Sequence, residues 1–316
     1  MNILISCNHN YLSCAKVCVQ SVISNHENIN LRFFVMHLKS DSLIYTVFKE
    51  QFVNVDIKDV PIPDEIGKEI VLPRKYNPHV TIEAYFRLFI IDYLPKDVDR
   101  ILYMDVDAVC NRDLSLIYDC DLRDCYVAGC KDYGFDLRPQ LKEEVYGNLN
   151  IPLNRLYVNS GVLIFNLKKI REDFTQDDVM HWLKKIENKI LFHDQDVINT
   201  LFYGNDIVEL PKEMNMRPFH YSCNHHNDHY IKRHAYIIHY GSKPWHNKFS
   251  DMAGEVYWKY ALMLGEGAEY ERWKKENKRY KRLFFLLILY RRLKHNINIF
   301  RHLKMKGLTS YYLTEK

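Results

Sequence analysis

The sequence predicts an α/β fold in which a mainly parallel sheet is flanked by helices. Short strand-like runs of apolar and β-branched residues alternate along the chain with longer segments of helical periodicity. A hydrophobic content of 47% over 316 residues is ample for a packed core. No internal repeat or Pro/Gly-rich linker interrupts the chain before about residue 250, so this part is expected to form one domain.

The first part of the chain carries alternating strand and helix patterns. Strands are predicted at Asn2–Ser6, Leu31–His37 and Val53–Ile57, with helices at Tyr11–Ser24 and Ser42–Phe52. Since a helix follows each of the first two strands, the strands are expected to run parallel, with helices on both faces of the sheet.

A further helix is predicted at Thr81–Tyr93, where apolar residues fall on one helical face. Glu83 and Arg87 lie four residues apart on another face. A weak surface ion pair between them is one expected role for Arg87.

Two aspartates follow the strand predicted at Arg100–Met104, in the run Asp105-Val106-Asp107. Open α/β sheets bind ligands at the carboxyl ends of their strands, so the pair stands where a ligand is expected. Two carboxylates spaced in this way present hard oxygen atoms that suit Mn²⁺ or Mg²⁺, and such a cation neutralises a diphosphate leaving group. Isolated Asp-x-Asp pairs also occur in turns and helix caps, so the pair alone does not establish a metal site.

Strand and helix patterns continue in the second half of the chain. Strands are predicted at Tyr126–Lys131, Val158–Asn166 and Ala235–Tyr240, with helices at Ile170–Ile190 and from Asp194 to Tyr203. No convincing strand pattern follows residue 240, and after about residue 250 the composition changes.

The eight cysteines are expected to be reduced core residues, because no basic export signal precedes the apolar start of the chain. The same observation predicts residence in the cytoplasm. Cys110, Cys120, Cys125 and Cys130 crowd one region but lack the paired C-x-x-C spacing of a structural zinc site.

Three further motifs accompany the Asp-x-Asp pair in a fixed order. They are Val158-Asn159-Ser160-Gly161-Val162-Leu163-Ile164-Phe165-Asn166, His193-Asp194-Gln195-Asp196 and His239-Tyr240-Gly241-Ser242-Lys243-Pro244-Trp245. Together the motifs resemble glycosyltransferase family 8, over about residues 1–245. The resemblance implies a GT-A fold, a Rossmann-like domain with a mixed, mainly parallel sheet. It also implies binding of a UDP-sugar with Mn²⁺ and transfer of a hexose with retention of configuration.

The resemblance assigns residues to the metal and to the diphosphate. Asp105 and Asp107 match the two carboxylate ligands, and His239 matches the histidine that completes the protein part of the metal shell. Neutral imidazole is an ordinary ligand for Mn²⁺. Lys243 matches the diphosphate contact, where a positive charge stabilises the leaving group. The segment between His239 and Lys243 is one residue shorter than in many relatives.

Other matched residues are implied to contact the donor. Asn8 and Asn10 follow the first strand, where the family contacts uracil and ribose. Relatives often carry an acidic residue in place of Asn8, but an Asn oxygen still accepts a hydrogen bond from uracil N3–H. Arg87 matches an arginine that contacts the donor, and Val106 and Gly241 are assigned to donor binding within their motifs.

The sugar is implied to lie against four residues. Asp132 and Asn159 match residues that hold its hydroxyl groups, and Asp194 and Gln195 match the pair nearest the anomeric carbon. Retention requires a covalent intermediate or departure and attack on one face. An uncharged amide oxygen is a poor nucleophile, so same-face attack is favoured, with Asp194 and Gln195 stabilising the oxocarbenium-like state. Asp194 as a covalent nucleophile is the alternative.

Two segments remain outside this assignment. The polar run His220–Tyr230 has side chains that suit zinc, but its spacing matches no known site, and a loop over the acceptor cleft is expected instead. Residues 251–316 are predicted to form a basic helical region whose apolar run, Leu283–Tyr290, is too short to span a bilayer. It suits an interfacial helix on an anionic membrane surface, with packing against the domain as the alternative. No recognised nucleic-acid-binding module accompanies the positive charge.

The sequence therefore predicts a cytoplasmic, membrane-peripheral, retaining transferase with its catalytic domain in residues 1–250. It would move glucose or galactose from a UDP-sugar to a glycan or lipid-linked acceptor such as lipopolysaccharide. A sugar nucleotidyltransferase is one alternative, but a Gly-rich phosphate loop is missing near Asn8. A non-catalytic binding protein is another, but it predicts loss of the metal and donor residues, which are all present.

Overall fold

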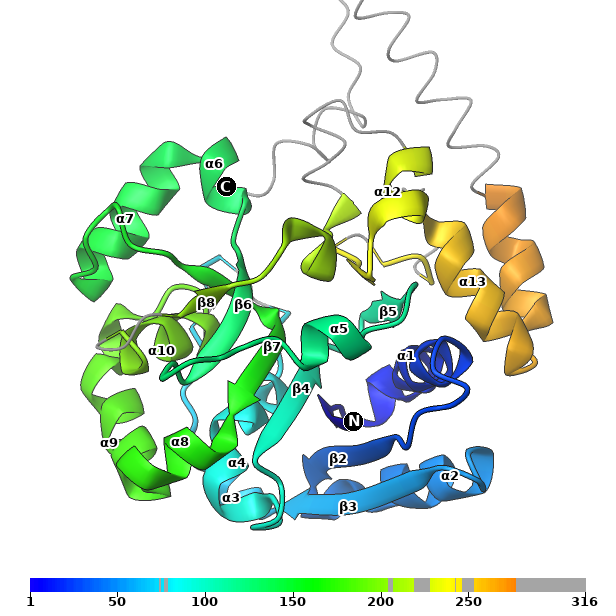
Figure 1. Cartoon of the computed structure of the whole chain (residues 1–316), viewed down its shortest axis with the longest axis horizontal. Coiled ribbons are helices and arrows are strands. Elements are labelled where there is room, and N and C mark those ends of the chain that lie inside the picture. The colour runs from blue at the N-terminus through cyan, green and yellow to red at the C-terminus, as the bar shows by residue number, and fades with distance from the viewer. Residues whose placement is uncertain are drawn as a thin grey trace, which may run out of the picture.

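The computed structural model describes residues 1–73, 75–76, 79–203, 207–218, 228–241, 243–245 and 253–276. The predictions for Leu283–Tyr290 and for most of His220–Tyr230 fall outside these residues. Figure 1 shows a central sheet with helices packed on both of its faces.

The central sheet has seven strands in the order β3-β2-β1-β4-β7-β6-β8. They are β1 (Asn2–Ser6), β2 (Arg32–Leu38), β3 (Asp56–Ile62), β4 (Arg100–Met104), β6 (Val127–Lys131), β7 (Val158–Asn166) and β8 (Val208–Glu209). β1 pairs in parallel with both β2 and β4, and β2 pairs in parallel with β3. β6 also pairs in parallel with β8. β7 is antiparallel to both β4 and β6. The sheet is thus mixed and mainly parallel, which confirms the predicted fold class.

The strand sequences match these places in the sheet. Central strands that are covered on both faces are near-continuous apolar runs, and β4 and β7 are buried over almost their whole length. Successive side chains point to opposite faces, so Leu4 joins the apolar cluster on one face while Ile3 and Ile5 join the cluster on the other.

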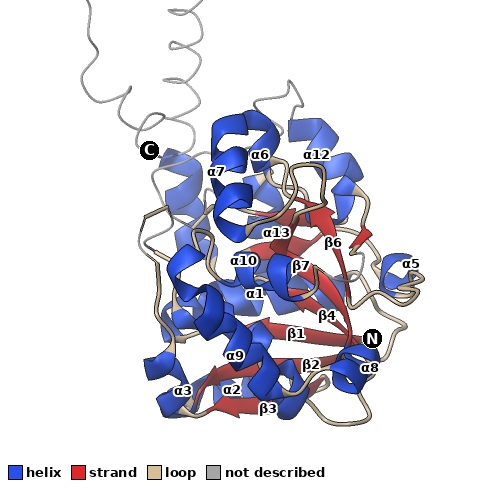
Figure 2. Ribbon diagram, turned by 90° about the vertical axis from the view of Figure 1, so that its left-hand side faces the viewer, coloured by secondary structure: helices blue, strands red, loops and turns tan. Residues whose placement is uncertain are grey.

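Helices of 4 to 13 residues supply the two outer layers, as Figure 2 shows from the side. They are α1 (Leu12–Ser24), α2 (Leu43–Gln51), α3 (Asp64–Glu69), α4 (Ile90–Tyr93), α5 (Ser115–Tyr118), α6 (Gly134–Leu137), α7 (Pro139–Leu149), α8 (Leu167–Asp173), α9 (Gln176–Ile186), α10 (Asp194–Leu201), α12 (Asp228–His234) and α13 (Gly254–Met263). Short 3-10 helices occur at His9–Tyr11, Lys39–Asp41, Ile82–Leu88, Glu187–Lys189 and Lys212–Asn215. One apolar cluster packs under α8, α9 and α10, and the other packs under α1 and α2.

Two predicted helices differ from the observed ones. The single helix expected at Thr81–Tyr93 is a 3-10 helix, Ile82–Leu88, followed by α4. In this segment Arg87 Nε donates a hydrogen bond to the backbone carbonyl of Ala84 at 2.8 Å. This side-chain bond competes with the backbone hydrogen bonds of an α-helix. The helix expected at Ile170–Ile190 is divided into α8 and α9, because Thr175 starts a new helix with a capping box.

Two predicted strands also differ. The strand expected at Val53–Ile57 begins later, as β3, because Val53 is 76% exposed in the turn after α2 while residues from Asp56 onward pair with β2. The strand expected at Ala235–Tyr240 is only β9 (Ile237–His239), and it lies outside the central sheet. It pairs antiparallel with β5 (Ala108–Cys110), a strand that was not predicted.

The described part of the C-terminal region packs on the domain. Tyr257, Trp258 and Trp273 share an apolar cluster with Cys14 and Val17 of α1. None of the helices in the described ranges combines the length and apolar character of a membrane span.

The described cysteines are reduced thiols, and six of these seven are buried. Burial raises the pKa of Cys7 to about 12, so this thiol stays protonated at neutral pH. The expectation of reduced core cysteines is confirmed for this part of the chain.

Candidate active site

Sheet topology brings the motif residues to one edge. β1 has β2 on one side and β4 on the other, so the chain segments after β1 and β4 diverge at a switch point. Asp105 follows β4 directly, and its N–H donates to Gly161 O at 2.8 Å. Because β7 is antiparallel to β4, Asn159 and Ser160 near its start lie at the edge where β4 ends.

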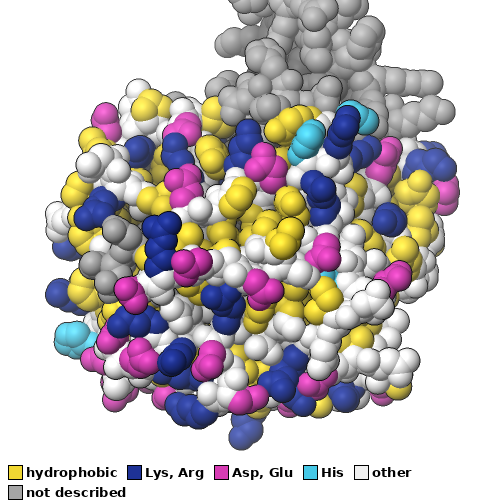
Figure 3. All heavy atoms as spheres, in the orientation of Figure 1, with side chains coloured by type: hydrophobic (Ala, Val, Ile, Leu, Met, Phe, Trp, Pro, Cys, Tyr) yellow, Lys and Arg dark blue, Asp and Glu magenta, His cyan; other side chains and the backbone are white. Residues whose placement is uncertain are grey.

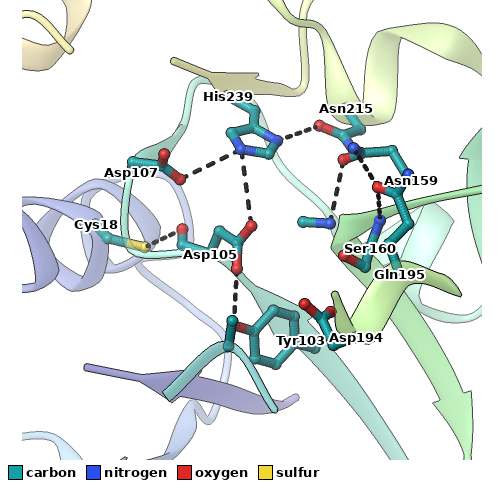
Figure 4. Close-up of polar contacts among 12 residues, drawn as sticks. Cys18, Tyr103, Asp105, Asp107, Asn159, Ser160, Asp194, Gln195, Asn215 and His239 are labelled. Atoms are coloured by element: carbon teal, nitrogen blue, oxygen red, sulfur yellow. Dashed lines mark hydrogen bonds and ion pairs between the residues drawn. The ribbon is translucent and has the colours of Figure 1, made fainter. Parts of the chain in front are cut away.

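Asp105, Asp107 and His239 form a group that can hold a metal ion, with one ligand atom from each within 4.8 Å of the others. His239 Nε2 lies 3.3 Å from Asp107 Oδ1 and 3.7 Å from Asp105 Oδ2 (Figure 4). The pairing of β5 with β9 sets Ala108 opposite His239, which brings the histidine to the Asp-x-Asp turn. Two carboxylates and an imidazole are a donor set that fits Mn²⁺ or Mg²⁺.

The two oxygen atoms of Asp105 have different surroundings. Oδ1 accepts hydrogen bonds from Arg87 Nη2 at 2.6 Å and from the Tyr103 hydroxyl at 2.8 Å. Oδ2 faces His239. Asp105 is therefore arranged to offer one oxygen to a cation while protein donors hold the other.

Arg87 is buried, and the expectation of a surface ion pair with Glu83 is wrong. The side chain is 2% exposed and pairs with Asp105 and, through Nε at 3.3 Å, with Asp194. Its guanidinium lies 3.8 Å from the centre of the Tyr103 ring. Glu83 is also buried and instead accepts from Asn8 Nδ2 at 3.0 Å. Arg87 thus joins the candidate metal group to the Asp-Gln-Asp motif.

Lys243 lies on the other side of the group. Its Nζ is 3.2 Å from Asp107 Oδ2 and 3.5 Å from the Tyr11 hydroxyl. Burial opposes ionisation of Asp107, but the neighbouring Lys243 and His239 hold the pKa of this carboxyl well below its usual range. Burial likewise opposes the charge of Lys243, yet Asp107 raises the pKa of the ammonium above its usual range. Both groups are charged at neutral pH.

A second polar cluster combines Asp132, Asn159 and Gln195, all buried. Gln195 Nε2 donates to Asp132 Oδ2 at 3.0 Å, and Asn159 Nδ2 donates to Gln195 Oε1 at 2.8 Å. The Ser160 N–H donates to the same Gln195 oxygen at 3.1 Å. This oxygen thus accepts two hydrogen bonds from the protein.

Asp194 is a buried carboxyl beside this cluster. Burial raises its pKa to about 6, Arg87 acts in the opposite direction, and Asp105 adds to the rise. The carboxylate is therefore ionised at neutral pH with Arg87 as its cationic partner.

The turn before α10 presents Asp194 and Gln195. His193 adopts φ 56° and ψ −137°, a backbone conformation that costs free energy outside glycine. Asp196 secures the turn, because its Oδ2 accepts the N–H groups of Leu191 at 2.6 Å and Phe192 at 2.8 Å. Its Oδ1 accepts from the hydroxyl of Tyr157.

The residues assigned to the nucleotide are more open. Asn8 is half-buried, and its Oδ1 accepts the N–H of Asn10 at 3.1 Å, while Asn10 itself is exposed. Val106 is half-buried between the two aspartates, and Gly241 is exposed. Among the assigned residues, Arg87 and Lys243 contact the metal group directly.

Gly161 and Asn215 are among the site residues that the sequence did not assign. A Cβ atom on Gly161 would lie 2.8 Å from Asp105 Oδ2 and even closer to the His239 ring, so only glycine fits there. A glycine inside a strand pattern was the available signal. Asn215 accepts from His239 Nδ1 at 3.0 Å through its Oδ1, and no motif marks this position.

Comparison with known proteins gives relatives of similar sequence. A protein of Haemophilus influenzae that carries a provisional glycosyltransferase name is 24% identical over 65% of this chain. The match spans 60% of that relative's length. The lipopolysaccharide 1,2-glucosyltransferase of Escherichia coli K12 is 28% identical over 83% of this chain and 77% of its own length.

Solved structures agree on the architecture. The galactosyltransferase LgtC, in complex with donor and acceptor sugar analogues, superposes with a TM-score of 0.70 at 23% identity. It covers 83% of this chain and 96% of its own. The sequence model described as glycosyl transferase family 8 matches residues 2–248. This match extends over most of the chain, and the fold agrees with it. The chain therefore belongs to glycosyl transferase family 8.

Proposed function

We propose that the protein is a retaining hexosyltransferase that moves glucose or galactose from a UDP-sugar to a glycan acceptor. The observation that carries the proposal is the continuity of the charged site. The candidate metal group contacts the Lys243 cation through Asp107, and it is joined to Asp194 through Arg87. The metal group with Lys243 would suit a diphosphate, and the neighbouring Asp194 would suit a sugar. A nucleotide diphosphate sugar needs both parts side by side.

Asp105, Asp107 and His239 are proposed to hold Mn²⁺, with Mg²⁺ as the alternative. The bound ion would supply positive charge that neutralises the diphosphate leaving group. Lys243 is proposed to contact the same diphosphate, since its ammonium is charged at neutral pH and only half-buried. Asn8, Asn10, Val106 and Gly241 are proposed to bind the rest of the nucleotide.

Asp132 and Asn159 are proposed to hold the sugar hydroxyl groups, with Asp194 and Gln195 near the anomeric carbon. The Gln195 oxygen already accepts two N–H groups, which supports a positioning role for this residue. In same-face attack, the bond from the anomeric carbon to the UDP oxygen breaks as the bond to the acceptor oxygen forms. The departing phosphate oxygen takes the acceptor's proton, and the Asp194 carboxylate stabilises the positive charge that develops on the sugar.

The acceptor is proposed to be lipopolysaccharide or another cell-surface glycan, a class that includes the acceptor in the name of the E. coli relative. We further propose that residues 1–250 form the catalytic domain and that the basic residues 251–316 attach it to the inner face of the cell membrane. The supporting observation is the apolar run Leu283–Tyr290 between cationic segments. The proposed location is cytoplasmic.

The test is release of UDP from UDP-glucose and UDP-galactose, with and without Mn²⁺. We expect release that depends on the ion, and loss of turnover in Asp105→Asn with an unchanged circular dichroism spectrum. NMR of the product should show the anomeric configuration of the donor. Full activity of the Asn variant would remove the metal assignment, and an inverted product would remove the retaining mechanism.

A further inference from the structure

A chain of four side-chain hydrogen bonds runs through the site from His239 to Asp132. Figure 4 labels the residues of this chain from His239 to Gln195. His239 Nδ1 bonds to Asn215 Oδ1 at 3.0 Å, and Asn215 Nδ2 donates to Asn159 Oδ1 at 2.8 Å. Asn159 Nδ2 donates to Gln195 Oε1 at 2.8 Å, and Gln195 Nε2 donates to Asp132 Oδ2 at 3.0 Å. The chain thus connects the candidate metal group to the second polar cluster, that of Asp132, Asn159 and Gln195.

Backbone groups fix the direction of this chain. The Gly161 N–H donates to Asn159 Oδ1 at 3.1 Å, and the Ser160 N–H donates to Gln195 Oε1 at 3.1 Å. A backbone N–H can only donate, so these two positions must hold amide oxygens. Asn215 must then offer its nitrogen to Asn159, which leaves its oxygen to face His239.

The direction determines the tautomer of His239. Because Asn215 presents an oxygen, Nδ1 of His239 carries a hydrogen, and in the tautomer that can bind a metal the lone pair is on Nε2. Nε2 is the atom that faces Asp105 and Asp107. A histidine that binds a metal through one nitrogen usually donates its other N–H to such an acceptor.

The position of Asn215 depends on backbone contacts rather than on a ligand. It ends the 3-10 helix Lys212–Asn215, and the next residue, Met216, donates to Ile237 O at 2.9 Å and accepts from the N–H of His239 at 3.0 Å. The Asn215 side chain is buried, as are Asn159 and Gln195. Breaking a link inside the protein leaves polar groups unsatisfied, which is costly.

We propose that Asn215 is a positioning residue that fixes the metal-binding tautomer of His239 and links it to the amide of Gln195. The role rests on the proposed function, since it concerns the same metal group. Asn215 acts through its neighbours, so its variants should change the tautomer and metal affinity as well as turnover.

Two variants separate the two parts of this role. Asn215→Ala removes both hydrogen bonds. Asn215→Asp keeps an oxygen for the His239 N–H but offers no N–H to Asn159. Asn111→Ala is the control, because Asn111 Nδ2 holds Lys232 O at 2.9 Å and Ala235 O at 3.0 Å ahead of the same strand, β9.

The tautomer is read from ¹⁵N NMR of the metal-free protein, and metal affinity from calorimetric titration with Mn²⁺. We expect Asn215→Ala to lose the fixed Nδ1–H tautomer and to bind Mn²⁺ about 10- to 100-fold more weakly. Asn215→Asp should keep the tautomer and bind Mn²⁺ at least as tightly, but its kcat for UDP release should fall. Asn111→Ala should match the wild type in all three measurements.

A wild-type tautomer and Mn²⁺ affinity in Asn215→Ala would overturn the proposal. Wild-type kcat in Asn215→Asp would overturn the link to Gln195. If the wild-type protein bound no Mn²⁺, the proposed metal site would fail, and the tautomer measurement would still decide the role of Asn215. If Asn215→Ala unfolds, Asn215→Asp still tests the link.

Discussion

At the scale of single residues, the site consists of buried and half-buried charges that have opposite partners within a few ångströms. Arg87 lies between Asp105 and Asp194, and Lys243 pairs with Asp107. A buried charge is tolerated only when it is paired and hydrogen-bonded. Removing one partner therefore leaves the remaining charge with an uncompensated desolvation cost. Arg87 therefore has a structural role in addition to any contact with the donor.

Replacing Arg87 by Met should destabilise the protein by about 3–5 kcal/mol at pH 7, because the buried Asp194 and the half-buried Asp105 lose their cation. Urea unfolding measures the change. The control is Arg32→Met, which breaks an exposed ion pair with Asp97 and should cost about 1 kcal/mol or less. Equal effects of the two substitutions would contradict the buried-pair argument.

Replacing Gly161 by Ala should abolish Mn²⁺ binding and UDP release, because the new methyl group would occupy the space between Asp105 and His239. Calorimetry and a turnover assay measure both effects. Gly147→Ala is the matched control, since a Cβ there meets nothing within 4 Å and alanine favours the helix. Retained Mn²⁺ affinity in Gly161→Ala would show that the aspartate and the histidine do not share an ion.

At the scale of elements, the start of α10 shows how local strain serves the site. Asp196 accepts hydrogen bonds from two backbone N–H groups and from the Tyr157 hydroxyl, and these bonds secure the strained turn at His193. Burial raises the pKa of Asp196 to about 6, so the fold favours its neutral form. At neutral pH this carboxyl is ionised, as that of Asp194 is, and its buried charge costs free energy in the folded protein.

This pKa makes stability depend on pH in a defined direction. The unfolded carboxyl ionises near pH 3.8 and the folded one near pH 6, so the free energy of unfolding should fall as pH rises between these values. The difference corresponds to roughly 3 kcal/mol. Asp196→Asn should remove this component, as measured by urea unfolding from pH 4 to pH 7.

Asp178 provides a control with the opposite sign. Hydrogen bonds from Thr175 hold the pKa of this exposed capping carboxyl below its usual value, so its stabilising effect is lost as pH falls. Asp178→Asn should therefore lower stability at pH 7 and have less effect at low pH. An unchanged pH profile in Asp196→Asn would contradict the prediction for Asp196.

At the scale of the whole molecule, the described part of the chain and the sequence that follows it differ in their distribution of charged residues. Over the face seen in Figure 3, Lys and Arg side chains are interspersed with Asp and Glu side chains. The sequence after Trp273, by contrast, is strongly basic around its apolar run. The proposed membrane contact is accordingly assigned to this region.

Truncation after Glu276 should weaken binding to vesicles that contain anionic lipid while UDP release and stability remain near wild-type values. The cut lies beyond Trp273, which is buried against Trp258 and Gly254. A truncation before Trp273 should instead destabilise the domain, because it removes this packing. Co-sedimentation with vesicles measures the first effect, and equal binding of the shortened chain would contradict the membrane proposal.

The sequence by itself determined the α/β class, most of the strands and the place of the Asp-x-Asp pair at the end of β4. These features follow from local apolar periodicity, and the strands that were predicted well are the buried ones. The family motifs also named His239 and Lys243. Local patterns were less successful where side chains compete for backbone groups, as at Thr175 and Arg87.

Only the tertiary structure decided how distant segments meet. The pairing of β5 with β9 brings His239 to the two aspartates. The antiparallel direction of β7 brings Gly161 beside Asp105 and His239. Arg87 had two expected roles, a donor contact and a surface ion pair, and the tertiary structure buries it against Asp105 and Asp194. Packing also places Asn215 against His239. The physical reason is that these contacts join residues far apart in the chain, and local periodicity carries no information about such pairing.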